Sequence, residues 1–221
     1  MIFAFFFGIV SIILFGVFLT TGYLCYLVRH SNHSKGKYIV EPAGETVSLC
    51  CVMGSGGHTT EMIELLKCLS ARYSPRWYII ADTDRMSKDK VLELEEERDK
   101  HDFEICTIPR SREVGQSFLT AVPTTLYSFV FALHIVWKAR PDLLLVNGPG
   151  SCIPVVFAAA LFDMVRLRDT IIIYEESICR VERLSLSGSI LYFLGLADDI
   201  VVQWKQLKEK YPRTTLISEL C

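Results

Sequence analysis

Charged side chains are missing from the first 28 residues of this 221-residue chain. A helix of that length rises roughly 42 Å, more than the ~30 Å hydrocarbon core of a bilayer. The stretch also has no basic residue at its start and no small-residue cleavage site, which argues against a cleaved signal peptide. We therefore predict an uncleaved transmembrane anchor at residues 1–28 and a juxtamembrane linker at residues 29–45.

A large excess of either charge is missing as well. The formal net charge is −2 and the isoelectric point is near 6.2, which argues against a nucleic-acid partner. The positive charges that flank the predicted anchor, Arg29, Lys35 and Lys37, all follow it. Because basic residues mark the cytoplasmic flank of a membrane helix, we expect a lumenal N-terminus and a cytosolic main domain on a single-pass protein.

The sequence also lacks cysteines at the spacings typical of metal or redox sites. The eight cysteines form no CxxC motif and no zinc-type spacing with histidines. This excludes the common zinc modules and is typical of reduced thiols in a reducing compartment. We expect neither a metal site nor a cofactor.

The remaining residues, 46–221, have the length of one domain and alternate between apolar runs and helical periodicity. The apolar runs predict strands at Thr46–Met53, Trp77–Ala81, Phe103–Ile108, Asp142–Val146, Thr170–Tyr174 and Asp199–Gln203. Helices are predicted at His58–Ser70, Ser87–Lys100, Cys152–Phe162 and Trp204–Lys210. This alternation predicts an α/β fold, a Rossmann-like doubly wound parallel sheet with ligands at the carboxyl ends of its strands.

The apolar segment Ser117–Trp137 allows three interpretations. It can be a helix that covers the sheet and has an apolar outer face, a second transmembrane helix, or a helix that dips into the bilayer interface. Pro123, several hydroxyl groups and His134 favour the first interpretation over the second.

Two glycine-rich loops follow predicted strands. The first reads Gly54-Ser55-Gly56-Gly57 and leads into a helix through His58 and Thr59, where Thr59 is a candidate cap. The second reads Asn147-Gly148-Pro149-Gly150. Missing side chains let backbone N–H groups and a helix N-terminus approach an anion closely. A tight structural turn would explain the first loop alone, whereas two such loops at one sheet edge fit a diphosphate.

Four further side chains could carry chemistry. His58 stands where the first loop becomes a helix, so it is a candidate general base toward a sugar hydroxyl, or a residue that only orients the loop. Glu176 is a second candidate base or a sugar-hydroxyl acceptor, unless it pairs with a neighbouring arginine, Arg180 or Arg183. Arg110 and Arg112 follow the third strand and offer guanidinium groups for phosphate, or are solvated charges.

Taken in order, five motifs resemble one family: GSGGHT at 54–59, ADTD at 81–84, IPRSRE at 108–113, NGPG at 147–150 and ESICRVE at 176–182. The family is the membrane-anchoring subunit of the eukaryotic UDP-N-acetylglucosamine transferase that extends dolichyl-diphosphate N-acetylglucosamine. The likeness runs from about Thr46 to Pro212. The glycine-loop pattern is also similar to the acceptor-binding half of the bacterial transferase that adds N-acetylglucosamine to a lipid-linked peptidoglycan precursor.

The resemblance implies one half of a glycosyltransferase-B enzyme, with residues 46–221 as the acceptor-binding domain. It implies that a soluble partner subunit brings UDP-N-acetylglucosamine and that the chain is inactive alone. It further implies the endoplasmic reticulum membrane, inversion to a β1,4 linkage, and contact with the preceding enzyme of the dolichol pathway. For catalysis, the resemblance implies roles for His58 and Glu176. For binding of the acceptor, the resemblance implies a set of residues from the same motifs: Gly54, Ser55, Gly56, Gly57, Thr59, Arg110, Arg112, Asn147, Gly148, Pro149, Gly150 and Ser177.

One departure from the family pattern lies at the end of the chain. Family members finish with an apolar tail after a glycine that helps to hold the partner, whereas residues 213–221 contain no glycine. Two other functions remain open. A membrane-anchored NAD(P)-dependent oxidoreductase would use the first loop as a GxGxxG motif and Asp82 to bind the ribose hydroxyls. Thr59, however, occupies the last position of this motif, where glycine or alanine is required for close packing. A noncatalytic membrane scaffold would only recruit an enzyme.

Overall fold

The computed structural model describes residues 16, 17, 19, 20, 22–24, 27, 46–98, 102–113, 115–148 and 150–219. Most of the predicted anchor, the whole predicted linker at 29–45 and Pro149 lie outside these residues. The described part of the first segment is helical, and Tyr23 and Leu27 pack against the core of the domain.

The described strands form one parallel sheet in the order β3-β2-β1-β4-β5-β6-β7. This confirms the predicted Rossmann-like fold. The order reverses between β1 and β4, which are adjacent in the sheet but separated in sequence by β2 and β3, so the switch point lies there. The strands are β1 (Val47–Val52), β2 (Tyr73–Ala81), β3 (Phe103–Ile108), β4 (Leu143–Asn147), β5 (Ile171–Glu175), β6 (Asp199–Val202) and β7 (Thr215–Leu216).

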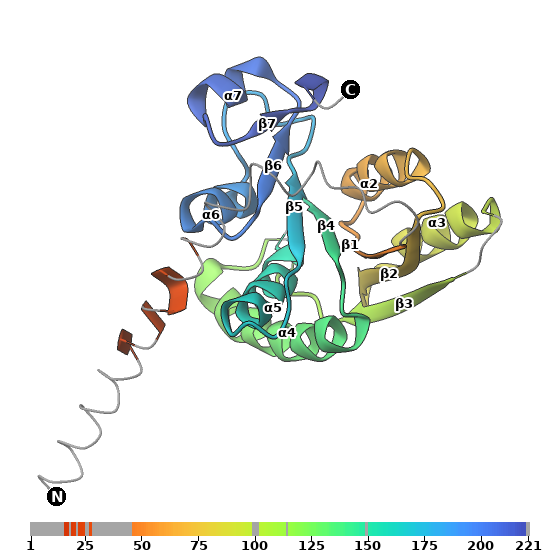
Figure 1. The fold of residues 1–221 in the computed structure, drawn as a ribbon, viewed down its shortest axis with the longest axis horizontal. Coiled ribbons are helices and arrows are strands. Elements are labelled where there is room, and N and C mark those ends of the chain that lie inside the picture. Colours follow the sequence, from red (N-terminus) through yellow and green to blue (C-terminus); the bar gives the residue numbers. More distant parts are fainter. Residues whose placement is uncertain are drawn as a thin grey trace, which may run out of the picture.

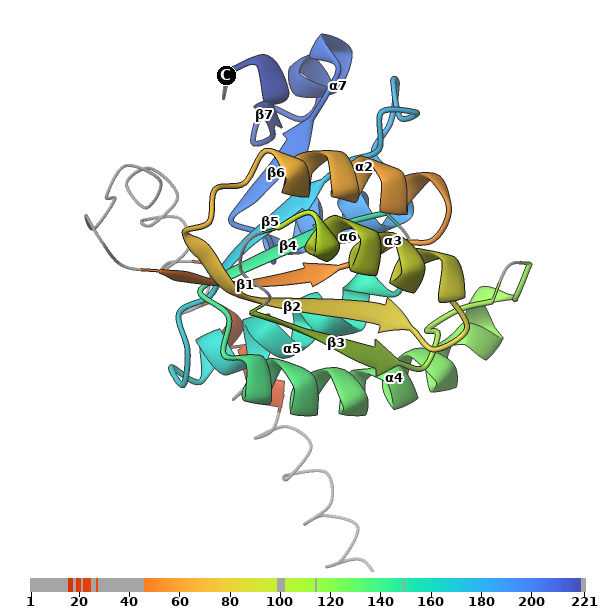
Figure 2. The same cartoon turned by 90° about the vertical axis from the view of Figure 1, so that its right-hand side faces the viewer.

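Helices cover both faces of the sheet, as a parallel sheet requires. Figure 2 shows α2 and α3 on one face and α4 and α5 on the other, and Figure 1 shows α6 beside the strands at the β5–β6 end. Each face has its own buried apolar cluster, one with α2 and α3 and one with α4, α5 and α6. The helices are α2 (Gly57–Lys67), α3 (Arg85–Glu96), α4 (Phe118–Ala139), α5 (Cys152–Met164), α6 (Leu186–Leu194), α7 (Lys205–Lys210) and the short 3₁₀ helix η1 (Ile217–Glu219).

All six predicted strands are present, but β2 starts at Tyr73 rather than at Trp77. The four additional residues include the charged Arg76. In the structure Arg76 is 1% exposed, because its guanidinium bonds both carboxylate oxygens of Glu95 at 2.6 and 2.7 Å. A buried charge is tolerated in a strand when it is paired and hydrogen-bonded in this way.

Helix α6 and strand β7 were not predicted. Helix α6 is only nine residues long, and Gly188 interrupts its apolar pattern. Its start is nevertheless fixed locally, because the Ser185 hydroxyl accepts the Gly188 N–H at 3.0 Å. Short apolar segments of this kind give an ambiguous periodicity.

Two helices begin earlier than predicted. Helix α3 begins at Arg85 rather than at Ser87, because the Asp84 side chain caps it by accepting the Ser87 N–H at 3.1 Å. Helix α2 begins at Gly57 and has Gly56 as its N-cap residue, without a side-chain cap. The prediction that Thr59 caps α2 is wrong, because its hydroxyl donates to the Gly54 carbonyl instead.

Helix α4 packs one face on the core of the domain, as the first interpretation of Ser117–Trp137 predicts. Ala132, Ile135 and Val136 are buried in the core cluster. The outer face remains apolar, with exposed Val122, Leu126, Tyr127, Val130, Phe131 and Trp137. Within the described residues, Thr120–Ala139 is the one helix long and apolar enough to cross a membrane, with a mean hydropathy of 1.3 and 28% of its window buried.

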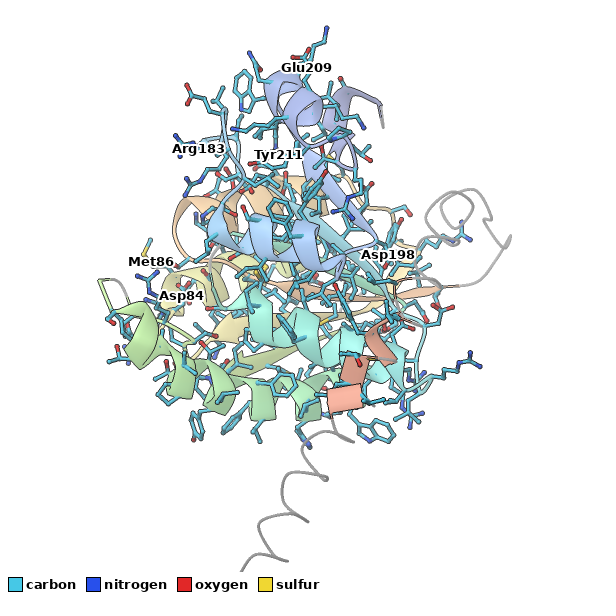
Figure 3. The ribbon with its side chains drawn as sticks, turned by 90° about the vertical axis from the view of Figure 1, so that its left-hand side faces the viewer. Asp84, Met86, Arg183, Asp198, Glu209 and Tyr211 are labelled. Atoms are coloured by element: carbon cyan, nitrogen blue, oxygen red, sulfur yellow. The ribbon has the colours of Figure 1, made fainter. Side chains whose placement is uncertain are left out.

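The two edges of the sheet carry different parts of the chain. In Figure 3 Asp84, Met86 and Arg183 lie toward the carboxyl edge, and Asp198 lies at the opposite edge, just before β6. Because every strand runs in the same direction, the loops that follow β1, β4 and β5 all open on the carboxyl edge.

Candidate functional site

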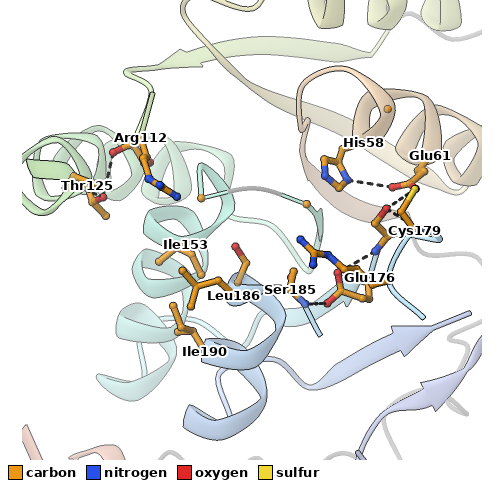
Figure 4. A pocket seen from close by; sticks show the side chains of 18 of the residues that line it. His58, Glu61, Arg112, Thr125, Ile153, Glu176, Cys179, Ser185, Leu186 and Ile190 are labelled. Atoms are coloured by element: carbon orange, nitrogen blue, oxygen red, sulfur yellow. Dashed lines mark hydrogen bonds and ion pairs between the residues drawn. The ribbon is translucent and has the colours of Figure 1, made fainter. Parts of the chain in front are cut away.

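A cavity of about 760 Å³ opens at the carboxyl edge, beside the switch point between β1 and β4. Figure 4 shows its lining, in which α2, the β5–α6 loop and helices α4, α5 and α6 converge. Seven predicted site residues line it: Gly57, His58, Arg112, Gly148, Gly150, Glu176 and Ser177. The sheet topology therefore brings together residues that lie up to 120 positions apart in the chain.

The first glycine loop leaves open space at the N-terminus of α2. Gly56 has a φ of +65°, a conformation that favours glycine, and a Cβ atom added at Gly56 or Gly57 would meet nothing within 4 Å. The open space is consistent with the approach of a ligand rather than with close packing. Beneath it Thr59, 1% exposed, bonds the Gly54 carbonyl and lies 2.6 Å from the Ser87 hydroxyl. Thr59 thus fixes the buried side of the first glycine loop through its hydroxyl group.

The second glycine loop is built against the first. Asn147 donates from its side-chain amide to the His58 carbonyl at 2.7 Å, which links the end of β4 to the start of α2. Gly148 has a φ of +70°, and a Cβ atom there would lie 2.5 Å from Cγ of His58. Only glycine fits both the backbone conformation and the close approach of the ring. The two loops therefore form one structural unit.

His58 is held from a second side by Glu61, one helical turn further along α2. Nδ1 of His58 lies 3.2 Å from Oε2 of Glu61, and the two side chains are 31% and 18% exposed. The other carboxylate oxygen of Glu61 accepts the Ser177 hydroxyl at 2.8 Å and the Ile178 N–H at 3.2 Å. Glu61 is not among the predicted site residues, although its position three residues after His58 places both on one helix face.

Glu176 lines the cavity but its carboxylate is already engaged. Oε1 accepts the Ser177 N–H at 3.1 Å and Oε2 accepts the Ser185 N–H at 2.7 Å, and the Ser185 side chain is a further hydrogen-bond partner. Burial raises the pKa of Glu176, and these amide bonds partly oppose the rise. These bonds close the loop between β5 and α6.

The two predicted arginines border a second, smaller cavity. Arg110, Arg112 and Ser55 line a smaller neighbouring cavity of about 290 Å³, and Arg112 borders both cavities. Arg110 lies 3.6 Å from a carboxylate oxygen of Glu113, and Nε of Arg112 donates to the Gln116 carbonyl at 2.9 Å. Both arginines therefore have partners near the glycine loops, although Arg110 is half-buried and Arg112 is exposed.

A second carboxylate, Glu175, lies behind the cavity at the end of β5. It is 4% exposed, and burial together with the charge of Glu61 raises its pKa from 4.5 to about 7. Gln203 donates to its Oε1 at 3.0 Å, whereas its Oε2 has no partner within the described chain. Asn147, its register neighbour on β4, has an unpaired Oδ1 as well. A protonated Glu175 is the form that suits this apolar, acceptor-rich place.

The opposite wall of the cavity is apolar. It consists of Val122 and Leu126 from α4, Ile153 from α5, and Leu186 and Ile190 from α6. Val122 and Leu126 also belong to the exposed apolar face of α4, with 55% and 61% of their surface exposed. The cavity therefore joins a polar end at the strand tips to an apolar end that continues onto the outside of the molecule. This wall was not predicted, because α6 was not predicted.

Some predicted site residues lie outside the two cavities. Gly54, Gly56, Thr59 and Asn147 line neither cavity and support the loops, and Pro149 is not among the described residues. The described cysteines are all free, and burial raises the pKa of Cys152 at the start of α5 to about 12. Among the described residues no group of three or more His, Cys, Asp or Glu side chains could hold a metal ion.

Comparison with protein families gives a match over most of the domain. The model of the family described as "Oligosaccharide biosynthesis protein Alg14 like" matches residues 49–220. The UDP-N-acetylglucosamine transferase subunit ALG14 of Homo sapiens is 46% identical over 183 residues, which cover 80% of this chain and 84% of the human protein. The Mus musculus subunit is 47% identical over 193 residues, covering 84% of this chain and 88% of the mouse protein. These relatives are similar along nearly their whole length.

Two solved structures align with this chain at low sequence identity. A Listeria monocytogenes protein assigned as a UDP-N-acetylglucosamine 2-epimerase aligns with a TM-score of 0.52 and 16% identity, covering 76% of this chain. The crystal structure of Acinetobacter baumannii MurG aligns with a TM-score of 0.49 and 15% identity, covering 70% of this chain. The chain spans 42% and 40% of the length of these two solved chains.

Proposed function

Because the chain belongs to the Alg14 family of oligosaccharide biosynthesis proteins, we propose that it is the acceptor-binding, membrane-anchoring subunit of a UDP-N-acetylglucosamine transferase. The acceptor is dolichyl-diphosphate N-acetylglucosamine, and the reaction adds the second N-acetylglucosamine in a β1,4 linkage. The chain works on the cytosolic face of the endoplasmic reticulum, with residues 1–28 as its anchor and residues 46–221 as its acceptor-binding domain.

The observation that carries this proposal is the cavity at the switch point, with its polar and apolar ends. The glycine loops offer backbone N–H groups and the N-terminus of α2 to a diphosphate. Arg112 borders the same space and supplies a positive charge. The apolar wall formed by α4, α5 and α6 suits the first isoprene units of the lipid. An amphiphile whose charge lies between a sugar and a hydrocarbon chain fits this arrangement.

His58 is the general base of the proposed reaction. It takes the proton from the acceptor hydroxyl as the hydroxyl oxygen attacks the anomeric carbon of the donor sugar. The bond from that carbon to UDP breaks on the opposite side, so UDP leaves with the bonding electrons and the configuration inverts. Glu176 supports this step by fixing the loop that carries Ser177, and Ser177 lines the cavity beside the acceptor sugar while its hydroxyl donates to Glu61.

A soluble partner supplies the donor in trans. The curated relatives are named subunits, which fits an enzyme divided between chains. The single sheet of the described residues provides the acceptor half, and the partner provides the site for UDP-N-acetylglucosamine. The partner docks across the carboxyl edge so that the two ligands face each other. The chain alone is therefore inactive. Contact with the preceding enzyme of the dolichol pathway would pass the acceptor on directly.

The membrane approaches the domain from the α4–α5 side. Tyr23 and Leu27, in the described part of the first segment, pack on the core cluster that contains α4, α5 and α6. The exposed apolar face of α4 belongs to the same side. A helix with one buried face and one apolar outer face can rest in the bilayer interface. The cavity mouth beside Leu126 would then open toward the lipid that carries the acceptor.

Reconstitution tests the proposal directly. The full chain is purified from membranes and assayed for transfer from UDP-N-acetylglucosamine to a polyprenyl-diphosphate N-acetylglucosamine acceptor, alone and with the soluble subunit. We expect turnover only from the pair. Turnover of the sugar nucleotide by the chain alone would refute the division of labour.

Variants of the site refine the test. His58→Ala should lower kcat about 10²- to 10⁴-fold, the usual contribution of general acid–base catalysis, while the partner still co-purifies. His134→Ala is the matched control, because His134 is exposed on α4 and lines neither cavity. Unchanged turnover in His58→Ala would remove the catalytic role of His58. Glycine-loop variants that keep both partner and full transfer would favour a noncatalytic scaffold.

A further inference from the structure

Glu61 uses both of its carboxylate oxygens to join two separate walls of the cavity. Oε2 faces Nδ1 of His58 at 3.2 Å, within the same helix. Oε1 accepts from the Ser177 hydroxyl at 2.8 Å and from the Ile178 N–H at 3.2 Å, across 116 and 117 positions of sequence. Figure 4 shows Glu61 between His58 and the β5–α6 loop. The carboxylate is therefore fixed by groups outside its own helix.

An ordinary surface pair on the same helix gives a comparison. Glu64 and Lys67 have the same spacing, and their charged groups lie 3.0 Å apart, but the side chains are 65% and 49% exposed. Glu61 is only 18% exposed and has two further donors. Exposed pairs contribute little and exchange partners freely, whereas a half-buried carboxylate held by three donors keeps one position. The His58–Glu61 pair is thus a built feature of the cavity.

The carboxylate decides which ring nitrogen of His58 carries the proton. A carboxylate only accepts hydrogen bonds, so the nitrogen that faces Glu61 must be protonated. In the neutral ring this places the hydrogen on Nδ1 and leaves the lone pair on Nε2. Gly148 limits the ring from the other side, since even a methyl group there would overlap it. The tautomer and the orientation of His58 are therefore both set by its surroundings.

We propose that Glu61 is the positioning residue for His58, which rests on the proposed role of His58 as the base. Glu61 keeps the Nδ1 proton in place while Nε2 receives the proton of the acceptor hydroxyl. The oxygen–hydrogen bond of the acceptor breaks, the new glycosidic bond forms, and UDP leaves with the electrons of its bond to the sugar. The positive charge that appears on the ring is balanced by the Glu61 carboxylate. Glu61 itself neither gains nor loses a proton.

Because Glu61 is also bonded to Ser177 and Ile178, the geometry of the base depends on the β5–α6 loop. A shift of this loop moves the carboxylate and with it the ring. A misplacement of about 1 Å can lower a rate about 100-fold. Ser177 would therefore act on catalysis through Glu61 as well as through any contact with the sugar.

Glu61→Gln in the full chain, with its soluble partner, tests the inference. The amide keeps the shape of the side chain but can donate to Nδ1, so it no longer selects one tautomer. We expect kcat to fall about 10- to 100-fold, while KM for the lipid acceptor changes less than about threefold. Glu64→Gln on the exposed side of α2 is the matched control and should keep the kcat of the unmodified chain.

A spectroscopic readout makes the test independent of turnover. In ¹⁵N-histidine-labelled full chain, the neutral His58 ring should show the chemical shifts of the Nδ1–H tautomer, assigned by its loss in His58→Ala. Glu61→Gln should turn this signal into a mixture of tautomers. An Nε2–H tautomer in the unmodified chain would overturn the inference, even if Glu61→Gln failed to fold.

The two proposals fail differently. If His58→Ala lowers kcat and Glu61→Gln does not, the positioning role is overturned and the proposed function stands. If His58→Ala leaves kcat unchanged, the proposed base is overturned. A low kcat in both variants, with a changed tautomer in Glu61→Gln, supports both.

Discussion

Replacing Glu175 by glutamine should make the domain more stable at neutral pH and remove part of its pH dependence. Glu175 is 4% exposed, and burial together with the nearby charge of Glu61 raises its pKa from 4.5 to about 7. Its ionised form is therefore disfavoured in the folded chain but not in the unfolded chain. Glutamine is always neutral and can still accept the hydrogen bond of Gln203.

The sign and size follow from proton linkage. Below pH 4.5 Glu175 is protonated in both states and does not affect stability. As the pH rises to about 7, the unfolded chain ionises and the folded chain does not, so the free energy of unfolding falls. Each unit by which the pKa of Glu175 in the folded chain exceeds its pKa in the unfolded chain corresponds to about 1.4 kcal/mol. The total loss of unfolding free energy is therefore about 3 kcal/mol. Above pH 7 the loss is complete and stays constant.

Urea unfolding of the full chain in a nonionic detergent, followed by tryptophan fluorescence, measures this effect between pH 4 and pH 8. The difference in unfolding free energy between Glu175→Gln and the unmodified chain should be near zero at pH 4. It should reach about 3 kcal/mol in favour of the variant at pH 8. Titrating groups that do not interact with Glu175 cancel in the difference. Glu64→Gln, at an exposed position, should leave the pH dependence unchanged. A pH-independent difference for Glu175→Gln would refute the reasoning.

Three further changes test other parts of the structure. Gly148→Ala should lower transfer at least about 10-fold while the partner still co-purifies, because the φ of +70° and the 2.5 Å approach to His58 exclude a methyl group. Arg76→Ala should lower the free energy of unfolding by about 3 kcal/mol in urea melts, since the buried Glu95 carboxylate loses its closest cation and keeps only Arg98 at 3.8 Å and the Tyr78 hydroxyl among its described partners. Leu126→Ser should raise KM about fivefold for a long-chain lipid acceptor and leave KM for a short-chain analogue unchanged in transfer assays, reflecting about 1 kcal/mol of lost apolar contact at the cavity mouth.

The fold could be predicted from the sequence because its signals are local. Buried parallel strands are continuous apolar runs, and each of the six predicted runs forms a strand. Strand β3 agrees with the prediction from Phe103 to Ile108. The errors arise where a distant partner changes the local preference. Arg76 belongs to a strand only because Glu95 from α3 neutralises it. Helix α6 is short and interrupted by a glycine that packs against Glu176.

The site could be predicted only in part. Glycine loops and polar residues at strand ends are visible in the sequence, and parallel topology brings them to one edge. Which of them touch each other is not visible, because the pairing depends on helix orientation across the sheet. Glu61 and Ser177 are 116 positions apart, and no spacing rule connects them. The apolar wall from α4 and α6 likewise depends on how these helices close over β4 and β5.

The switch point explains why one glycine serves both the fold and the chemistry. At this place the chain leaves β4 next to β1, so the loop after β4 must pass over the start of α2. Asn147 uses this proximity to bond the His58 carbonyl, and Gly148 uses it to leave room for the His58 ring. A side chain at position 148 would force the loop away from α2, and the bond from Asn147 would be lost with it. The position of the base is therefore a consequence of the strand order, and the anion-binding loops need no separate device to hold it.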